Sequence, residues 1–478
     1  MVKFNFKKIA AGLAVAFMAF GLAACGGVAD EEVFVWPDYI DRQTLFYGQT
    51  LTIGVSANGR EGMRLVPFVN AYMRANPGVN IEFIYLDGDI ERTREQIAVQ
   101  FMAGTAPMLV PGHHVQYPNM HNHDMFANWF PLMEAHPHFN EADWQMNVFD
   151  AFAMDGRLLG LSPTFQYMYV MVNSAVPGLA EATAGRDSIT LAEMIELYEH
   201  FYDPLNSKMI MNGFDVRWAL TGWHTHNFFD FNTGYVNFNN QEFIELITQM
   251  RGLTNPHQLL GHPRQIGRPG DRYLELEWSQ RYMFRQATSH PFEYFSIFDE
   301  NTIFVNPLLV VNDDGELLIH GAPSETWLLS AGATPIQRAL AMDFILFIAG
   351  NENDTLRLES LFSPAAGFLN APWFPSGAPV NRYLLYRDGN FAFANMLNQL
   401  FINNNWRLAG TQEEADEKIF ARMHTAAEMP MARPFHAPWL ITDLINEHLE
   451  LFNSGLQTAQ QTAENLQNSV TLAMMEVQ

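Results

Sequence analysis

The chain has 478 residues and a formal net charge of −25, from 27 Lys and Arg against 52 Asp and Glu. Hydrophobic residues make up 48% of it and aromatic residues 13%, which excludes general disorder, and the length predicts two lobes or domains. The acidic balance argues against a nucleic-acid partner, because phosphate binding needs a basic surface. The single cysteine excludes disulfides within the chain and multi-cysteine metal or redox sites.

The N-terminus is typical of a lipoprotein signal peptide over residues 1–24. Three lysines precede an apolar run at 9–24, which is shorter than a membrane-spanning helix requires. The run ends Leu22-Ala-Ala-Cys25-Gly, which resembles the lipobox of bacterial lipoproteins; an ordinary secretory signal with an incidental cysteine is the alternative. Two acyl chains suffice for anchoring, so we expect a lipidated cysteine at the extracytoplasmic face of the cell membrane. Residues 25–49 then form an acidic tether, of which 33–36 is apolar enough to dock on the body.

From residue 51 onward, the pattern alternates between strand and helix. Apolar runs predict strands at 51–55, 79–86 and 108–110. Apolar residues at helical spacing predict the helices between them, at Val66–Met73 and 90–103. In the second helix Ile97, Phe101 and Met102 are expected to face inwards. This order predicts a parallel sheet with helices on both faces, and such sheets bind ligands at the carboxyl ends of their strands.

A series of short phrases runs through about 420 residues of the body. In chain order they are Asn76-Pro-Gly-Val79, Phe101-Met-Ala-Gly-Thr-Ala-Pro107, Trp129-Phe-Pro-Leu-Met133, Asp155-Gly-Arg-Leu-Leu-Gly-Leu-Ser-Pro163, Tyr169-Val-Met-Val-Asn173, Ile189-Thr-Leu-Ala-Glu-Met194, Trp327-Leu-Leu-Ser330, 334–344 and a closing helix at 459–475. Each phrase is weak alone, but their order behind a lipobox resembles that of the extracellular solute-binding proteins, family 1, of ABC importers. That family includes maltose- and oligosaccharide-binding lipoproteins.

The resemblance implies an α/β, two-lobed periplasmic-binding-protein-like fold (type II), with a three-crossing hinge and a helical C-terminal region. We expect the crossings near Ser162–Phe165, near His320–Ser324 and near Pro364–Gly367. The implied domains are the signal peptide at 1–24, the lipidated cysteine and tether at 25–49, lobe one at 50–163 plus 322–363, and lobe two at 164–321 plus 364–478. The closing helix should pack through the stripe Ala459, Ala463, Leu466, Val470 and Met474.

No enzyme motif was found: the chain has no P-loop, no nucleophile elbow, no His-Glu-x-x-His and no dinucleotide-binding glycine pattern. We therefore expect no enzyme and no cofactor, although two carboxylates at the right separation would suffice for a glycosidase. The densest group of metal-ligand types comprises His113, His114, His121, His123, Asp124, His136 and His138. A metal site and a polar loop are both compatible with that spacing, and we expect no metal.

A site that holds a sugar needs flat aromatic surfaces for the ring and polar groups for its hydroxyls. The candidates lie where the implied fold places loops at the ligand site, and they are Asn58, Arg60, Thr105, His113, His114, Phe165, Gln166, Trp223, His224, Ser324, Glu325, Trp327 and Phe368. Trp327 has core packing as an alternative role, and Trp129 is expected in the core. The non-periodic stretch 222–230 combines rings with polar tips, a mixture that is hard to explain as plain core.

These expectations combine into one functional hypothesis. The chain is a tethered, monomeric extracytoplasmic protein that captures a carbohydrate, in particular an oligosaccharide, by hinge closure. It then delivers the ligand to the transmembrane permease subunits of an ABC transporter. The alternatives are a carrier of a metal, a polyamine or a peptide, and a surface glycan hydrolase.

Overall fold

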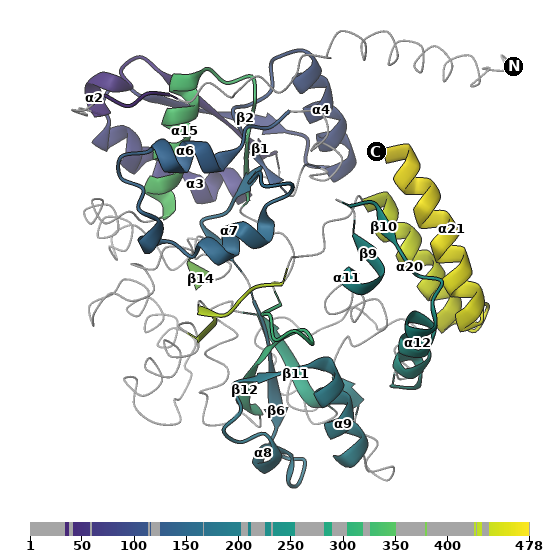
Figure 1. Cartoon of the computed structure of the whole chain (residues 1–478). Coiled ribbons are helices and arrows are strands. Elements are labelled where there is room, and N and C mark those ends of the chain that lie inside the picture. The colour runs from purple at the N-terminus through teal and green to yellow at the C-terminus, as the bar shows by residue number, and fades with distance from the viewer. Residues whose placement is uncertain are drawn as a thin grey trace, which may run out of the picture.

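The structure is a computed structural model of the whole chain (Figure 1). It describes residues 34–37, 42–57, 60–112, 115, 125–165, 167–201, 209–211, 225–230, 233–253, 282–288, 304–318, 326–349, 378–379, 425–426, 428–432 and 439–477. Within these ranges, no helix is both long enough and apolar enough to cross a membrane.

The first lobe is built on a five-stranded sheet in the order β2-β1-β3-β13-β4. Its strands are β1 (Thr50–Ser56), β2 (Asn80–Leu86), β3 (Leu109–Pro111), β4 (Gly160–Leu161) and β13 (Trp327–Leu329). β1 runs parallel to β2 and β3, which confirms the predicted start of the fold. The sheet is mixed beyond this start, because β13 comes from far along the chain and pairs antiparallel with both β3 and β4.

Helices cover both faces of this sheet, as predicted. They are α2 (Arg42–Leu45), α3 (Arg60–Ala75), α4 (Ile90–Met102), α6 (Trp129–Ala135), the 3-10 turn η2 (Glu141–Asp143), α7 (Met146–Phe152) and α15 (Pro335–Ala349). α15 is buried along 339–349 and packs with α3 on one face, whereas Ile97 of α4 packs with Leu86 and Val110 on the other. The expected inward position of Met102 is wrong: in the last turn of α4 it is 68% exposed.

The second lobe has its own five-stranded sheet, in the order β7-β12-β6-β11-β8. Its strands are β6 (Met168–Asn173), β7 (Ser188–Ile189), β8 (Met209–Met211), β11 (Tyr282–Thr288) and β12 (Phe304–Val310). The central strand β6 is buried along its whole length and is antiparallel to β11 and β12. A bulge in β12 centres on Asn306, whose φ is 50° and whose side-chain amide donates to the carbonyl oxygen of Ala180 at 2.7 Å.

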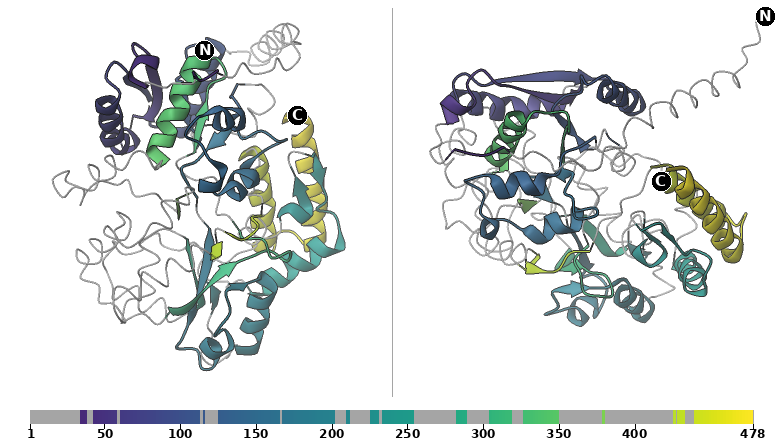
Figure 2. Two further views of the ribbon diagram at one scale, coloured as in Figure 1. Left: turned by 60° about the vertical axis from the view of Figure 1, so that its left-hand side comes forward. Right: turned by 45° about the horizontal axis from the view of Figure 1, so that its top comes forward.

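The helical part of lobe two lies beside this sheet (Figures 1 and 2). The remaining described elements of the lobe are α8 (Leu179–Ala182), α9 (Leu191–Phe201), α11 (Thr225–Phe228), β9 (Phe229–Asp230), β10 (Tyr235–Val236), α12 (Gln241–Leu253), α20 (Trp439–Asn453) and α21 (Ala459–Val477). α9 starts with a capping box, in which Thr190 and Glu193 each accept a hydrogen bond from the other's backbone N–H. The predicted closing helix is confirmed as α21, and Ala463, Leu466 and Val470 of its stripe are fully buried.

The chain passes between the lobes directly after β4. The short strand β5 (Thr164–Phe165) follows, pairs with β14 (Ala378–Pro379), and leads into β6 of lobe two. The second passage joins β12 to β13, and its central residues 319–325 lie outside the described part, as does the expected third crossing. The two-lobed α/β fold is therefore confirmed, whereas the exact domain boundaries stay predictions.

Candidate functional site

The strands of the two lobes end toward each other. β4 is parallel to β1, β2 and β3, and the chain leaves its carboxyl end to enter lobe two, so the other three strands also end on that side. β6 starts at the same passage, and the strands antiparallel to it, β11 and β12, therefore end there, together with β7 and β8. We call the set of carboxyl ends the interlobe edge. Open α/β sheets bind their ligands at such ends.

Lobe one contributes two acids to this edge that the sequence analysis did not single out. Asp87 and Asp89 directly follow β2, and the Asp87 carboxylate accepts the backbone N–H of Asp89 at 2.9 Å. The backbone N–H of Asp87 in turn donates to the side chain of Gln96 at 2.8 Å, which fixes the turn before α4. Their position straight after a predicted strand was the signal that would have found them.

Two aromatic candidates lie at the passages themselves. Phe165 is completely buried on β5, and its ring lies 5.7 Å from that of the equally buried Tyr167. Trp327 is 3% exposed at the start of β13 and pairs in register with Pro111 and Leu161, the last residues of β3 and β4. Both candidates therefore stand at the interlobe edge, and both pack in the core of lobe one.

The indole N–H of Trp327 is buried, and no described residue accepts a hydrogen bond from it. The backbone carbonyl of Trp327 accepts the indole N–H of Trp129 at 3.1 Å. The predicted core position of Trp129 is confirmed, since that side chain is completely buried.

The other candidates divide into three groups. Arg60 is the first residue of α3, which follows β1. Thr105 is exposed in the turn between α4 and β3, at the amino end of β3 and so at the edge of the sheet opposite to the other candidates. The candidates outside the described residues are Asn58, His113, His114, Gln166, Trp223, His224, Ser324, Glu325 and Phe368.

The stretch 222–230 only partly matches its expected role. Trp223 and His224 directly precede α11, beyond the described residues. Phe228 and Phe229, however, are core residues with 1% and 2% exposure, and the ring of Phe228 lies 5.1 Å from that of Phe243. The expectation that this stretch is not plain core is therefore wrong for these two rings, because α12 folds over them.

One member of the histidine group has a structural role. His136 is 2% exposed, and its Nε2 lies 3.2 Å from Oδ1 of the buried Asp343. Its Nδ1 accepts the backbone N–H of His138, so both ring nitrogens are occupied by protein partners. Among the residues described, no group of three His, Cys, Asp or Glu side chains is arranged to hold a metal ion.

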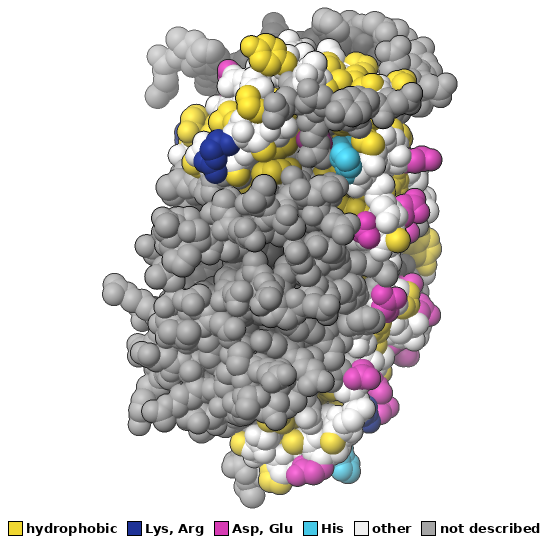
Figure 3. All heavy atoms as spheres, turned by 90° about the vertical axis from the view of Figure 1, so that its left-hand side faces the viewer, with side chains coloured by type: hydrophobic (Ala, Val, Ile, Leu, Met, Phe, Trp, Pro, Cys, Tyr) yellow, Lys and Arg dark blue, Asp and Glu magenta, His cyan; other side chains and the backbone are white. Residues whose placement is uncertain are grey.

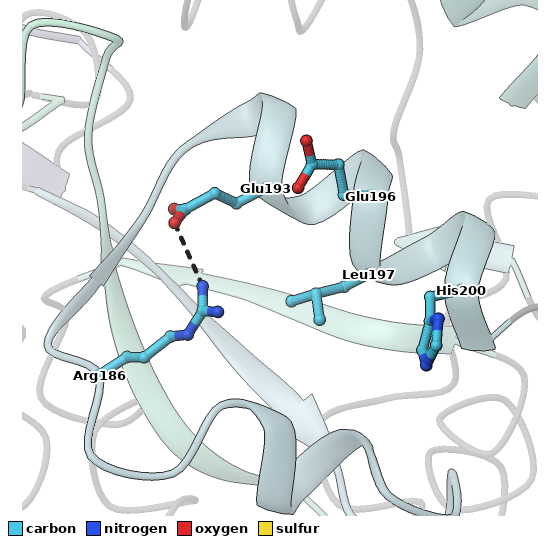
Figure 4. A pocket seen from close by; sticks show the side chains of 5 residues that line it. All are labelled: Arg186, Glu193, Glu196, Leu197 and His200. Atoms are coloured by element: carbon cyan, nitrogen blue, oxygen red, sulfur yellow. Dashed lines mark hydrogen bonds and ion pairs between the residues drawn. The ribbon is translucent and has the colours of Figure 1, made fainter.

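A polar pocket of about 340 Å³ lies on lobe two (Figure 4). Its lining residues are Arg186, Glu193, Glu196, Leu197 and His200. An ion pair of 3.2 Å joins Arg186 to Glu193, and none of the described residues that line the space is Trp, Tyr or Phe. The pocket follows α9 away from the interlobe edge, so we do not assign ligand capture to it.

The fold resembles those of solved binding proteins at low sequence identity. The sugar-binding protein MalE from Xanthomonas citri superposes with a TM-score of 0.58 at 14% identity, over 89% of this chain and 98% of that one. An extracellular solute-binding protein of family 1 from Alicyclobacillus acidocaldarius gives 0.53 at 16% identity, over 89% and 98%. The ABC substrate-binding protein Lmo0181 from Listeria monocytogenes, in complex with cycloalternan, gives 0.52 at 14%, over 89% and 99%.

Comparison of the sequence with known families and proteins gives no match. No protein-family model and no curated protein sequence matches the chain. The structural likeness extends over nearly the whole length of each neighbour and across both lobes of this chain. The chain therefore has the two-lobed fold of the extracellular solute-binding proteins.

Proposed function

We propose that this chain is the substrate-binding protein of an ABC importer and that it captures a carbohydrate between its two lobes. The observation that carries the proposal is the arrangement of the two sheets, whose strands end toward each other at the interlobe edge. Loops from both lobes meet at such an edge, so one ligand can contact both lobes and draw them together.

The class of ligand follows from the side chains and from the neighbours. Trp223, among the sequence candidates, would supply an apolar surface for a sugar ring, and Asp87 and Asp89 after β2 would supply acceptors for its hydroxyls. Structural neighbours are described with cycloalternan and with maltose bound, which favours an oligosaccharide over a polyamine, peptide or metal.

Delivery is the second part of the proposal. Cys25 carries the lipid, the permease subunits recognise the closed lobes, and the protein works as a monomer on the extracytoplasmic face of the membrane. The support is the signal-like N-terminus with its lipobox-like ending. No covalent step on the ligand is required.

Thermal unfolding with a panel of ligands tests the capture proposal. The panel contains maltose, longer linear and cyclic maltooligosaccharides, spermidine, and Zn²⁺ and Ni²⁺. A true ligand at 100 times its Kd stabilises the folded chain by about 2.7 kcal/mol. Stabilisation by a saccharide, with the saccharide recovered intact, supports the proposal. Stabilisation by only a metal or spermidine, or hydrolysis of the saccharide, contradicts it.

A further inference from the structure

We propose that residues 34–37 are a docking segment that fixes lobe one beside the membrane and leaves lobe two as the moving lobe. This inference rests on the lipid anchor of the proposed function. It goes further because it assigns different roles to the two lobes. The structure shows the docking itself, and the consequences follow from where the anchor lies in the chain.

The docking segment packs on lobe one through two aromatic rings. Trp36 lies 4.5 Å from the ring of His136 and 5.8 Å from that of Phe46, in both cases edge to face. Phe34 packs edge to face on Trp36 at 5.5 Å. Val35 between them is 87% exposed, whereas Phe34 and Trp36 are half-buried. This alternation is that of an extended segment with one face on the protein.

The surface beneath Trp36 is rigid. The imidazole of His136 is held from both sides, by the Asp343 carboxylate at Nε2 and by the backbone N–H of His138 at Nδ1. Asp343 also accepts the hydroxyl of the buried Tyr72 at 2.7 Å. Since Nδ1 accepts, the proton lies on Nε2 and points at Asp343. The ring of His136 that Trp36 contacts is therefore held in place by hydrogen bonds within lobe one.

The position of the docking segment limits the reach of the anchor. Only residues 26–33, eight in number, separate Cys25 from Phe34. Even fully extended, eight residues span about 30 Å, whereas a chain undocked as far as Arg42, where α2 begins, would span about 60 Å. The docked Trp36 thus holds the body within roughly one lobe's diameter of the lipid.

The anchored side is the end of lobe one that carries α2. β1 begins there, so this end lies opposite the interlobe edge. Figure 3 faces the side on which α2 lies, and apolar side chains gather at this end among the residues drawn in colour. Exposed apolar residues here include Val35, 87% exposed, and Tyr47, 73% exposed. Along the chain, lobe one lies between the anchor and lobe two, so in this proposal hinge motion displaces lobe two.

Energy transfer to labelled lipid tests this assignment in the lipidated chain. A donor dye is placed on an added cysteine at an exposed acid, either Glu134→Cys in lobe one or Glu242→Cys in lobe two. The acylated Cys25 does not react with the dye. In phosphatidylcholine vesicles we expect higher transfer from position 134 than from 242. Trp36→Ala should lower transfer from 134 and reduce the difference, while Trp36→Phe and the adjacent control Val35→Ala should behave like the wild-type chain.

Chymotrypsin provides a second readout that measures the docking directly. Cleavage between Phe34 and Val35, identified by the mass of the released body, requires the segment to leave lobe one. Trp36→Ala should raise that cleavage rate about tenfold, because proteolysis follows the population of the open segment. Val35→Ala should not raise it.

The outcomes separate this inference from the proposed function. Equal transfer from the two positions in the wild-type chain, or no effect of Trp36→Ala on either readout, overturns the docking proposal and leaves capture unaffected. A chain that does not associate with vesicles overturns both the anchor and this inference, while saccharide binding in solution still tests capture on its own.

Discussion

The indole N–H of Trp129 donates a hydrogen bond of 3.1 Å to the backbone carbonyl of Trp327, 198 residues further along the chain. The donor lies before the first passage between the lobes and the acceptor lies just after the second. This bond therefore ties together two segments of lobe one that the whole of β6 to β12 separates. It stands next to the end of β3, where the candidate ligand surface begins.

Loss of this bond should weaken lobe one. Trp129→Phe keeps a buried ring but removes the donor and part of the volume, so we expect a loss of about 1–3 kcal/mol in the free energy of unfolding. Urea denaturation measures it. Val99→Ala is the control, since Val99 is 58% exposed and its truncation should stay within about 0.5 kcal/mol. Equal effects of the two substitutions would refute the structural role of the bond.

The hydroxyl of Tyr72 should stabilise the fold through Asp343. It is buried and donates to the carboxylate at 2.7 Å, and hydrogen bonds to charged groups contribute about 1.5–3 kcal/mol. Tyr72→Phe should therefore lower the free energy of unfolding by about that amount. Tyr85→Phe removes the same hydroxyl from a ring that is 63% exposed and should leave the denaturation midpoint unchanged. A small effect at Tyr72 would show that the pair is not a stabilising contact.

The turn before β2 depends on glycine at position 78. Gly78 has a φ of 95°, and a Cβ added there would overlap the ring of Tyr47. Gly78→Ala should cost about 1–3 kcal/mol from the backbone alone, with the overlap in addition. Adding Tyr47→Ala to the same chain should remove the overlap and leave the backbone cost. A double-mutant cycle separates these two contributions to the loss in the free energy of unfolding. Strict additivity of the two substitutions would mean that the ring does not sit over the glycine.

Ligand binding should depend on Trp223 and not on the polar pocket of lobe two. Trp223→Ala should weaken binding of the saccharide identified in the panel at least tenfold, which is about 1.4 kcal/mol. The unfolding midpoint of the ligand-free chain should not change. His200→Ala, which alters the pocket along α9, should bind like the wild-type chain. Titration calorimetry compares them. If His200→Ala weakened binding and Trp223→Ala did not, the binding site would lie at the pocket along α9.

The first half of lobe one could be read from the sequence because its elements are local. Strands β1 and β2 and helices α3 and α4 each show their own apolar period, and the turn at Asn76–Gly78 separates them clearly. Helix α15 was expected only from the family phrase at 334–344, and the structure shows that it is buried over 339–349. Met102 was misjudged, because a helical period does not tell where the covering element ends.

The rest depends on contacts between distant segments, which no local pattern contains. The place of β13 between β3 and β4 is decided by pairing with Pro111 and Leu161. His136 looked like one of a group of histidines, yet its partner is Asp343, 207 residues later. The sequence around Phe228 and Phe229 did not predict a core position, because the helix that buries them, α12, lies further along the chain. Most candidate ligand residues lie outside the described ranges and stay predictions.

The distance between the lobes tests the central claim of capture by closure most directly. Dyes on Glu134→Cys in lobe one and Glu242→Cys in lobe two, in a chain whose Cys25 is acylated or replaced by serine, report that distance by single-molecule energy transfer. Without ligand we predict either one population at the longer, open distance or two populations, open and closed. With oligosaccharide at the concentration that stabilises the fold, we predict a single population at the shorter, closed distance. Tight oligosaccharide binding with an unchanged distribution of distances would contradict the account.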